Sequence, residues 1–169
     1  PPAGFVQVLK RDQWKNVVAF SKAVDAPIVT SFAVSNGTRG ADGVWTPAQA
    51  QRLLDLTREA GGSLYAAEFF NESNMPGAAP EMPKAYTAAN YAAEFRLFRD
   101  WARKAAPEMR ILGVGGVGEA GLLTDVPVPA ELGTHVSTED MMKANPDSVD
   151  AVSYHFYGSV SQRCLGLGI

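Results

Sequence analysis

The sequence is poor in cysteine, histidine and long apolar runs, and each shortage argues against a class of protein. A single cysteine, Cys164, cannot form an internal disulfide. The two histidines and this cysteine do not have the spacing of a metal site with any acidic residues, so we predict no metal and no other cofactor. No apolar run is long enough to span a bilayer. The formal net charge of −3 provides no basic surface for nucleic acid.

What the sequence does contain is a regular alternation of amphipathic and apolar stretches. Its 169 residues, of which 46% are hydrophobic, suffice for one domain with a real core. Helical spacing of apolar residues predicts four helices, capped in three cases by Asp12, Thr46 and Ser137. We predict helices over 13–24, 47–60, 85–106 and 138–144, and strands over 28–34, 63–70, 109–114 and 149–157. The aromatic stripe of the third helix is interpreted as core.

Helices that alternate with strands are typical of an α/β fold with a parallel sheet. A (β/α)8 barrel needs eight strands and about 250 residues, so this chain would be only part of one. The alternative is a doubly wound sheet with a dinucleotide site, which Gly113, Gly115 and Gly118 suggest as a GxGxxG match. The segment after these glycines contains two prolines, however, and is a poor candidate for the helix that a dinucleotide site needs. We therefore prefer the interpretation that the glycines let the end of the strand bend into a loop.

The stretch from Ser63 to Asn74 is central to the functional interpretation. Its apolar first part predicts a buried parallel strand, and its polar end includes Glu72. Barrel enzymes carry their catalytic groups at the carboxyl ends of such strands. Phe69 and Phe70 would form an apolar wall, which disfavours the ionised form of a carboxyl and so suits a general acid. The alternative interpretation is a glutamate that caps the next helix or faces solvent.

Several segments, in order, resemble one enzyme family. AEFFNESN resembles the barrel strand that ends in Asn-Glu in a large clan of retaining glycosidases, and Glu68 matches an acidic position in it. RGADGVW, AQAQRLLDL and VDAVSYHFY resemble further segments of the heparanase and β-glucuronidase family, glycoside hydrolase family 79. The resemblance covers about Gln13 to Tyr157. Ser73 departs from it, because the family usually has proline after the glutamate.

The resemblance implies that residues 1–169 are part of one catalytic (β/α)8 TIM barrel and contribute about strands three to six. It implies that Glu72 is the general acid/base and that Asn71 binds the sugar 2-hydroxyl. Tyr157 would hold the nucleophile carboxylate, and His155 and Glu119 would line the pocket. The nucleophile itself is expected at the end of the seventh strand, on a second polypeptide segment that completes the barrel.

The implied substrate is a β-glucuronide, in an oligosaccharide or a heparan-sulfate-like glycosaminoglycan, and the implied location is secreted, periplasmic or extracellular. Arg39 and Arg163 are candidates for binding its negative charge. Two alternatives stay open: a carbohydrate-binding barrel without catalysis, and another retaining barrel glycosidase such as a xylosidase. A glutamate facing Glu72 from the seventh strand would favour the enzyme. Four βα units alone would expose two sheet edges, so we expect residues 1–169 by themselves to associate or aggregate.

Overall fold

The computed structural model describes residues 8–78, 82–83, 85–117 and 134–156. It is an α/β structure with a parallel sheet of four strands in the order β1-β2-β3-β4. The helices and strands follow one another along the chain as α1 (Arg11–Ala23), β1 (Ile28–Ser31), α2 (Ala48–Glu59), β2 (Leu64–Glu68), α3 (Ala88–Ala105), β3 (Arg110–Val117), α4 (Thr138–Ala144) and β4 (Ala151–His155). Two short 3₁₀ helices, Asn36–Thr38 and Pro76–Ala78, lie in the loops after β1 and β2.

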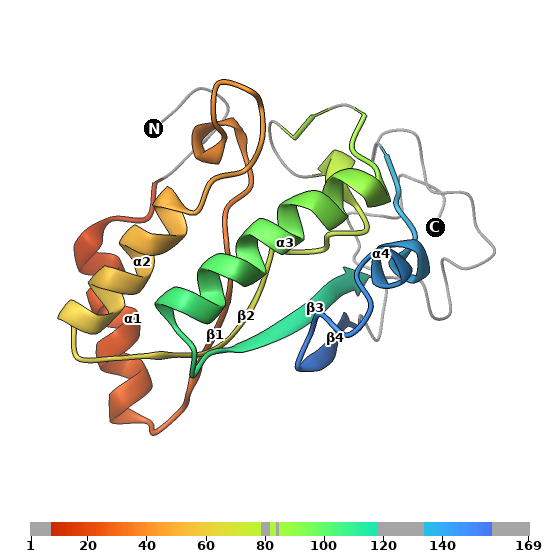
Figure 1. The fold of residues 1–169 in the computed structure, drawn as a ribbon. Helices are drawn as coiled ribbons and strands as arrows, with labels where there is room; N and C mark the ends of the chain where they lie inside the picture. The colour runs from red at the N-terminus through yellow and green to blue at the C-terminus, as the bar shows by residue number, and fades with distance from the viewer. Residues whose placement is uncertain (1–7, 79–81, 84, 118–133, 157–169) are drawn as a thin grey trace, which may run out of the picture.

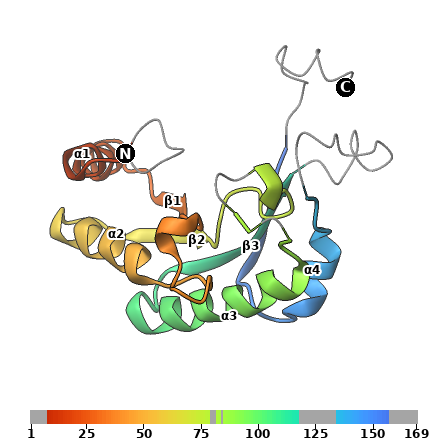
Figure 2. The same ribbon diagram turned by 90° about the horizontal axis from the view of Figure 1, so that it is seen from above.

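The strand order of the sheet can be compared with the two predicted architectures. Strands that are adjacent in sequence are adjacent in the sheet, and all pairs are parallel. Right-handed crossovers then place every connecting helix on the same face. The helices do follow one another around one side of the strands, from α1 through α2 and α3 to α4 (Figures 1 and 2). Within the described residues the order has no reversal, which a doubly wound sheet requires.

The core lies between the sheet and α3 and is strongly aromatic. Phe98 on α3 is fully buried and stacks on Phe69 with ring centroids 5.3 Å apart. Trp45, from the loop before α2, meets Phe69 edge-on at 5.1 Å. Tyr91 and Phe95, also on α3, are each 1% exposed. The predicted role of this stripe as core is therefore confirmed, and such contacts add about 0.5–1.5 kcal/mol per pair beyond burial.

The glycines of the GxGxxG match also serve packing. Gly113 and Gly115 lie inside β3, not in the strand-to-helix turn that a dinucleotide fingerprint needs, and Gly118 lies outside the described residues. A β-carbon on Gly113 would come within 2.5 Å of Val149. The close approach of the segment before β4 therefore requires glycine at position 113.

The predicted helix start is correct for α4 and displaced for the other three helices. Ser137 accepts a hydrogen bond from Asp140 N and caps α4 as predicted. The predicted cap at Thr46 is wrong, because its hydroxyl donates to Thr38 O at 3.0 Å and Pro47 takes the capping position. Asp12 is also not a cap, since α1 already begins at Arg11. The starts of α1 and α2 are displaced by two residues and one residue, and α3 begins at Ala88 instead of residue 85, after its cap Thr87.

Apolar side chains stay exposed at both edges of the sheet. Val29 on the edge strand β1 is 56% exposed. On the other edge strand, β4, Val152 is 71% exposed, and Phe156, directly after this strand, is 74% exposed. Edges of this kind promote association. None of the described helices is long and apolar enough to cross a membrane.

Candidate functional site

The candidate site lies where β2 ends and the chain turns. β2 ends at Glu68, and residues 71–74 form a tight turn closed by a hydrogen bond from Met75 N to Glu72 O at 2.8 Å. Glu72 has a φ of +51°. This left-handed conformation is uncommon for a residue with a side chain and costs on the order of 1–3 kcal/mol. Strained residues of this kind cluster at functional sites, which is consistent with the role predicted for Glu72.

Side chains next to Glu72 fix the turn against β3. The Ser73 hydroxyl is fully buried and donates to Val114 O. The Asn74 side chain binds Val117 twice, donating to its carbonyl at 2.8 Å and accepting from its N–H at 2.9 Å. Ser73 thus has a structural part in the turn, which a residue without a hydroxyl could not take.

Phe69 and Phe70, which were expected to form a wall beside Glu72, pack into the aromatic core. They are 1% and 2% exposed, and Phe70 meets Tyr86 edge-on at 6.0 Å. An imidazole faces Glu72. His155 Nδ1 lies 3.5 Å from Glu72 Oε1. Because His155 ends β4, the carboxyl edge of the sheet brings together two residues that are 83 positions apart in sequence.

The same imidazole contacts a second, more deeply buried carboxyl group. His155 Nε2 lies 3.3 Å from both carboxyl oxygens of Glu68. The Glu68 side chain is 9% exposed, compared with 25% for Glu72 and 26% for His155. Ser31 Oγ lies 3.4 Å from Glu68 Oε2. The site is therefore a Glu68–His155–Glu72 cluster in which one imidazole bridges two carboxyl groups.

Two neighbours show how closely the fold surrounds the Glu68 carboxyl. A β-carbon built on Gly115 would lie 2.8 Å from the carboxyl carbon of Glu68, so a side chain at position 115 would displace this carboxyl group. Gly115 also has a φ of +67°, which favours glycine. Burial raises the pKa of the Tyr91 hydroxyl, the charge of Glu68 raises it further, and a hydrogen bond with Ser73 opposes the shift. Tyr91 therefore stays a neutral phenol beside the cluster.

The structure brings together only some of the predicted site residues. Glu72 and His155 face each other, and Asn71 is exposed in the same turn. Glu119 and Tyr157, and likewise Arg163, lie outside the described residues. Sequence reasoning gave Glu68 no functional part. An available signal was an acidic residue inside an otherwise apolar, buried strand, because a charged residue is rarely buried without a partner.

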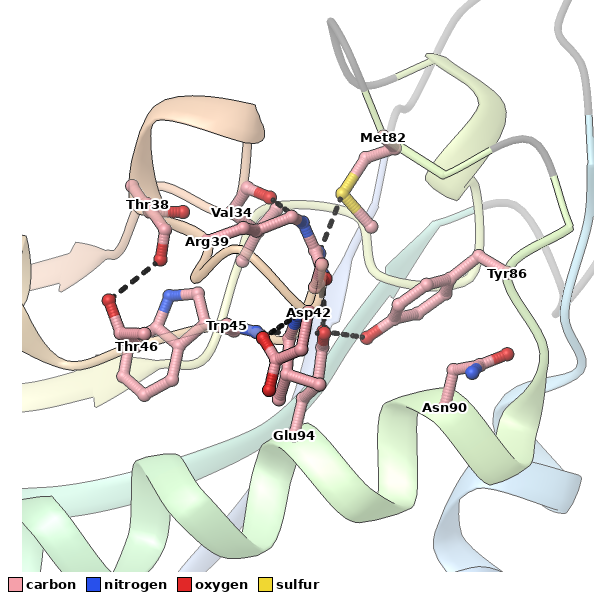
Figure 3. A network of polar contacts seen from close by, with 12 residues as sticks. Val34, Thr38, Arg39, Asp42, Trp45, Thr46, Met82, Tyr86, Asn90 and Glu94 are labelled. Carbon is pink, nitrogen blue, oxygen red and sulfur yellow. Dashed lines mark hydrogen bonds and ion pairs between the residues drawn. The ribbon is translucent and has the colours of Figure 1, made fainter.

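Arg39 is not available to bind a substrate, contrary to expectation. Its guanidinium is 3% exposed and forms a buried ion pair with Glu94 of α3. Glu94 also accepts hydrogen bonds from the Tyr86 hydroxyl at 2.9 Å and from Trp45 N at 3.1 Å (Figure 3). Arg39 further donates to Val34 O at 2.9 Å. The RGADGVW segment therefore fixes the loop after β1 onto α3.

The cluster is suited to proton transfer. Each carboxyl group can hold or accept a proton, and the imidazole between them can donate on one side and accept on the other. Among the described residues no group of three or more histidine, cysteine, aspartate or glutamate side chains could hold a metal ion. The comparisons with known proteins return no match to a protein-family model or to a curated protein.

Proposed function

We propose that this chain is part of a retaining glycoside hydrolase that acts on β-glucuronides, in oligosaccharides or in a heparan-sulfate-like glycosaminoglycan. The observation that carries the proposal is the position of Glu72. Its carboxyl group stands at the carboxyl edge of a parallel sheet and faces His155 from another strand. The resemblance of AEFFNESN to a glycosidase strand that ends in Asn-Glu supports the same role. With this function we also propose that the protein is secreted or periplasmic.

The proposed architecture is a (β/α)8 barrel to which this chain contributes strands three to six. The four parallel strands in sequential order, with helices on one side, fit half of such a barrel. The exposed apolar side chains at both edges of the sheet fit strands that pair with further polypeptide. That polypeptide would also supply the nucleophile, a glutamate at the end of the seventh strand.

The proposed mechanism assigns Glu72 two successive roles. In the first step its protonated carboxyl gives a proton to the departing glycosidic oxygen, while the nucleophile attacks the anomeric carbon. In the second step the Glu72 carboxylate takes a proton from water, which releases the sugar with retained configuration. The two carboxyl groups must stand about 5–5.5 Å apart. Asn71, which is exposed in the same turn, would bind the sugar 2-hydroxyl, a contact that strengthens in the transition state.

The test uses the complete enzyme, meaning this chain with the polypeptide that completes the barrel. Glu72→Gln should abolish hydrolysis of alkyl glucuronides, whose leaving oxygen needs a proton. It should slow cleavage of a dinitrophenyl glucuronide far less, because that leaving group departs as an anion. Glu59→Gln is the matched control. Glu59 is an exposed glutamate at the end of α2, before the start of β2, and so lies far along the strand from the proposed site.

The outcomes separate the proposal from its alternatives. Equal activity of Glu72→Gln and wild type on the alkyl substrate would remove Glu72 from the acid/base role. Binding of glucuronide oligosaccharides without any turnover by wild type would favour a carbohydrate-binding barrel. Faster turnover of an aryl xyloside than of the matching glucuronide would favour a xylosidase.

A further inference from the structure

We propose that Glu68 is a positioning residue that fixes the tautomer of His155 and, through this imidazole, aligns the carboxyl group of Glu72. The inference rests on the proposed role of Glu72 as the acid, and it assigns a function to a residue that touches no substrate. Glu68 is too deeply buried to contact a sugar, since its side chain is only 9% exposed.

The geometry gives each ring nitrogen a different partner. Nε2 lies at equal distances, 3.3 Å, from the two oxygens of Glu68, and Nδ1 lies 3.5 Å from Glu72 Oε1. The distance to Glu72 is long for a hydrogen bond in the absence of substrate. Contacts of catalytic groups often tighten only when substrate binds.

A carboxylate at position 68 determines which nitrogen carries the proton. A carboxylate can only accept hydrogen bonds, so Nε2 must be the protonated nitrogen that donates to Glu68. In the neutral ring Nδ1 then carries a lone pair. That lone pair accepts a hydrogen bond from Glu72 only when Glu72 is protonated, which is the form that a general acid needs.

The proton balance of the reaction stays with Glu72. In the first step its O–H bond breaks and the proton goes to the departing oxygen as the C–O bond breaks. In the second step the Glu72 carboxylate takes a proton from the attacking water. His155 and Glu68 end each cycle with the protons they had at the start. Their contribution is to hold the Glu72 carboxyl in one orientation.

An amide at position 68 should loosen this alignment without removing volume. The NH₂ group of glutamine can donate to an unprotonated Nε2, so the ring can adopt the other tautomer and point Nδ1–H at Glu72. In a serine protease the same change to the residue that orients the catalytic histidine leaves the geometry intact but gives the wrong tautomer. Here it would favour the Glu72 carboxylate, which cannot act as an acid.

The first experiment measures kcat/KM of the complete enzyme for an alkyl and a dinitrophenyl glucuronide. Glu68→Gln should lower the alkyl value by about 10- to 100-fold, because general acid catalysis contributes roughly 10²–10⁴ and only its alignment is lost. The dinitrophenyl value should change by less than about 3-fold, since that leaving group needs little protonation. His155→Asn should give the same pattern, and the double variant should lose no more than either single variant.

Glu59→Gln again serves as the control, and melting temperature with near-UV circular dichroism confirms that each variant is folded. Equal losses on both substrates would show that Glu68 is only structural. Unchanged alkyl activity in Glu68→Gln, with Glu72→Gln strongly impaired, would overturn the positioning role and leave the proposed function intact. Additive losses in the double variant would also contradict a role exerted through His155.

A spectroscopic measurement makes the test independent of turnover. Proton–nitrogen correlation spectra of the imidazole rings, with His155→Asn to assign the signals, report which ring nitrogen is protonated. Wild type should show a protonated Nε2 in His155, and Glu68→Gln should shift this signal while that of His135 stays in place. Ring signals of His155 that do not respond to Glu68→Gln would overturn the inference, even if Glu72 proves to be the acid. If wild type cleaves no glycoside, the proposed function fails. The imidazole signals still show in that case whether Glu68 determines the tautomer of His155.

Discussion

Removing the Glu94 carboxyl should be among the most destabilising changes in the described chain. Glu94 and Arg39 have side chains that are 7% and 3% exposed, so neither charge can be solvated if its partner is lost. Glu94 is also the acceptor for the Tyr86 hydroxyl and for Trp45 N. In Figure 3 Arg39 and Trp45 approach Glu94 from the loop after β1, and Tyr86 approaches it from the segment before α3.

The expected size of the effect follows from these contacts. Breaking a buried ion pair by removing one partner costs about 3–5 kcal/mol. Leaving a buried donor without an acceptor costs about 1–3 kcal/mol, but these penalties overlap and cannot be summed. We therefore expect Glu94→Ala to lower the free energy of unfolding by about 4 kcal/mol, out of roughly 5–15 kcal/mol for a typical protein.

The assay is urea denaturation of the complete protein at pH 7, followed by tryptophan fluorescence, in a double-mutant cycle with Arg39→Met. The variant that combines Glu94→Ala with Arg39→Met should lose much less stability than the sum of the two single changes, because it leaves no unpaired charge. A loss below about 1 kcal/mol for Glu94→Ala, or an additive cycle, would refute the reasoning for a buried, coupled pair.

Three further predictions concern the sheet and its surroundings. Gly115→Ala should displace Glu68 and lower both the melting temperature and alkyl-glucuronide activity, whereas Gly37→Ala, whose β-carbon meets nothing within 4 Å, should change neither. The pKa of Asp150 lies below the usual 3.8 because Arg103 and Ile111 N donate to it. The ionised Asp150 therefore stabilises the fold above the unfolded-state pKa, and this stabilisation is lost as pH falls through the lower folded-state pKa. The difference in stability between wild type and Asp150→Asn, measured by urea denaturation, should therefore disappear in acid. Residues 1–169 alone should sediment as oligomers or aggregates with a weak near-UV signal; a monodisperse, cooperatively melting monomer would contradict the half-barrel proposal.

The order of elements could be predicted from the sequence because it depends on local signals. Apolar periodicity located all four helices and strands, and Ser137 capped α4 as expected. The lengths were less predictable: β1 ends at Ser31 instead of residue 34, and β3 continues to Val117 instead of ending at residue 114. Strand ends depend on pairing with neighbours, which the sequence does not specify locally.

The candidate site could be predicted only as far as single strand ends. Glu72 and His155 were placed at one edge of the sheet, but their contact depends on strand order and register. The partner of Arg39 is Glu94, 55 positions away, so a substrate-binding arginine and a buried structural one look alike in sequence. The sequence predicts Glu68 inside a buried strand, at an acidic position of the strand it resembles, and only the folded sheet places it against His155.

The most direct test of the central claim is a rescue experiment on Glu72→Ala in the complete enzyme. With a dinitrophenyl glucuronide the variant should form the glycosyl-enzyme but release it slowly, because no base activates water. Sodium azide needs no base, so it should accelerate turnover and yield β-glucuronosyl azide, identified by proton NMR. Azide should not accelerate wild type or Glu59→Gln. Wild-type turnover by Glu72→Ala, or a rate that azide does not change, would contradict the assignment of Glu72 as the acid/base of a retaining glycosidase.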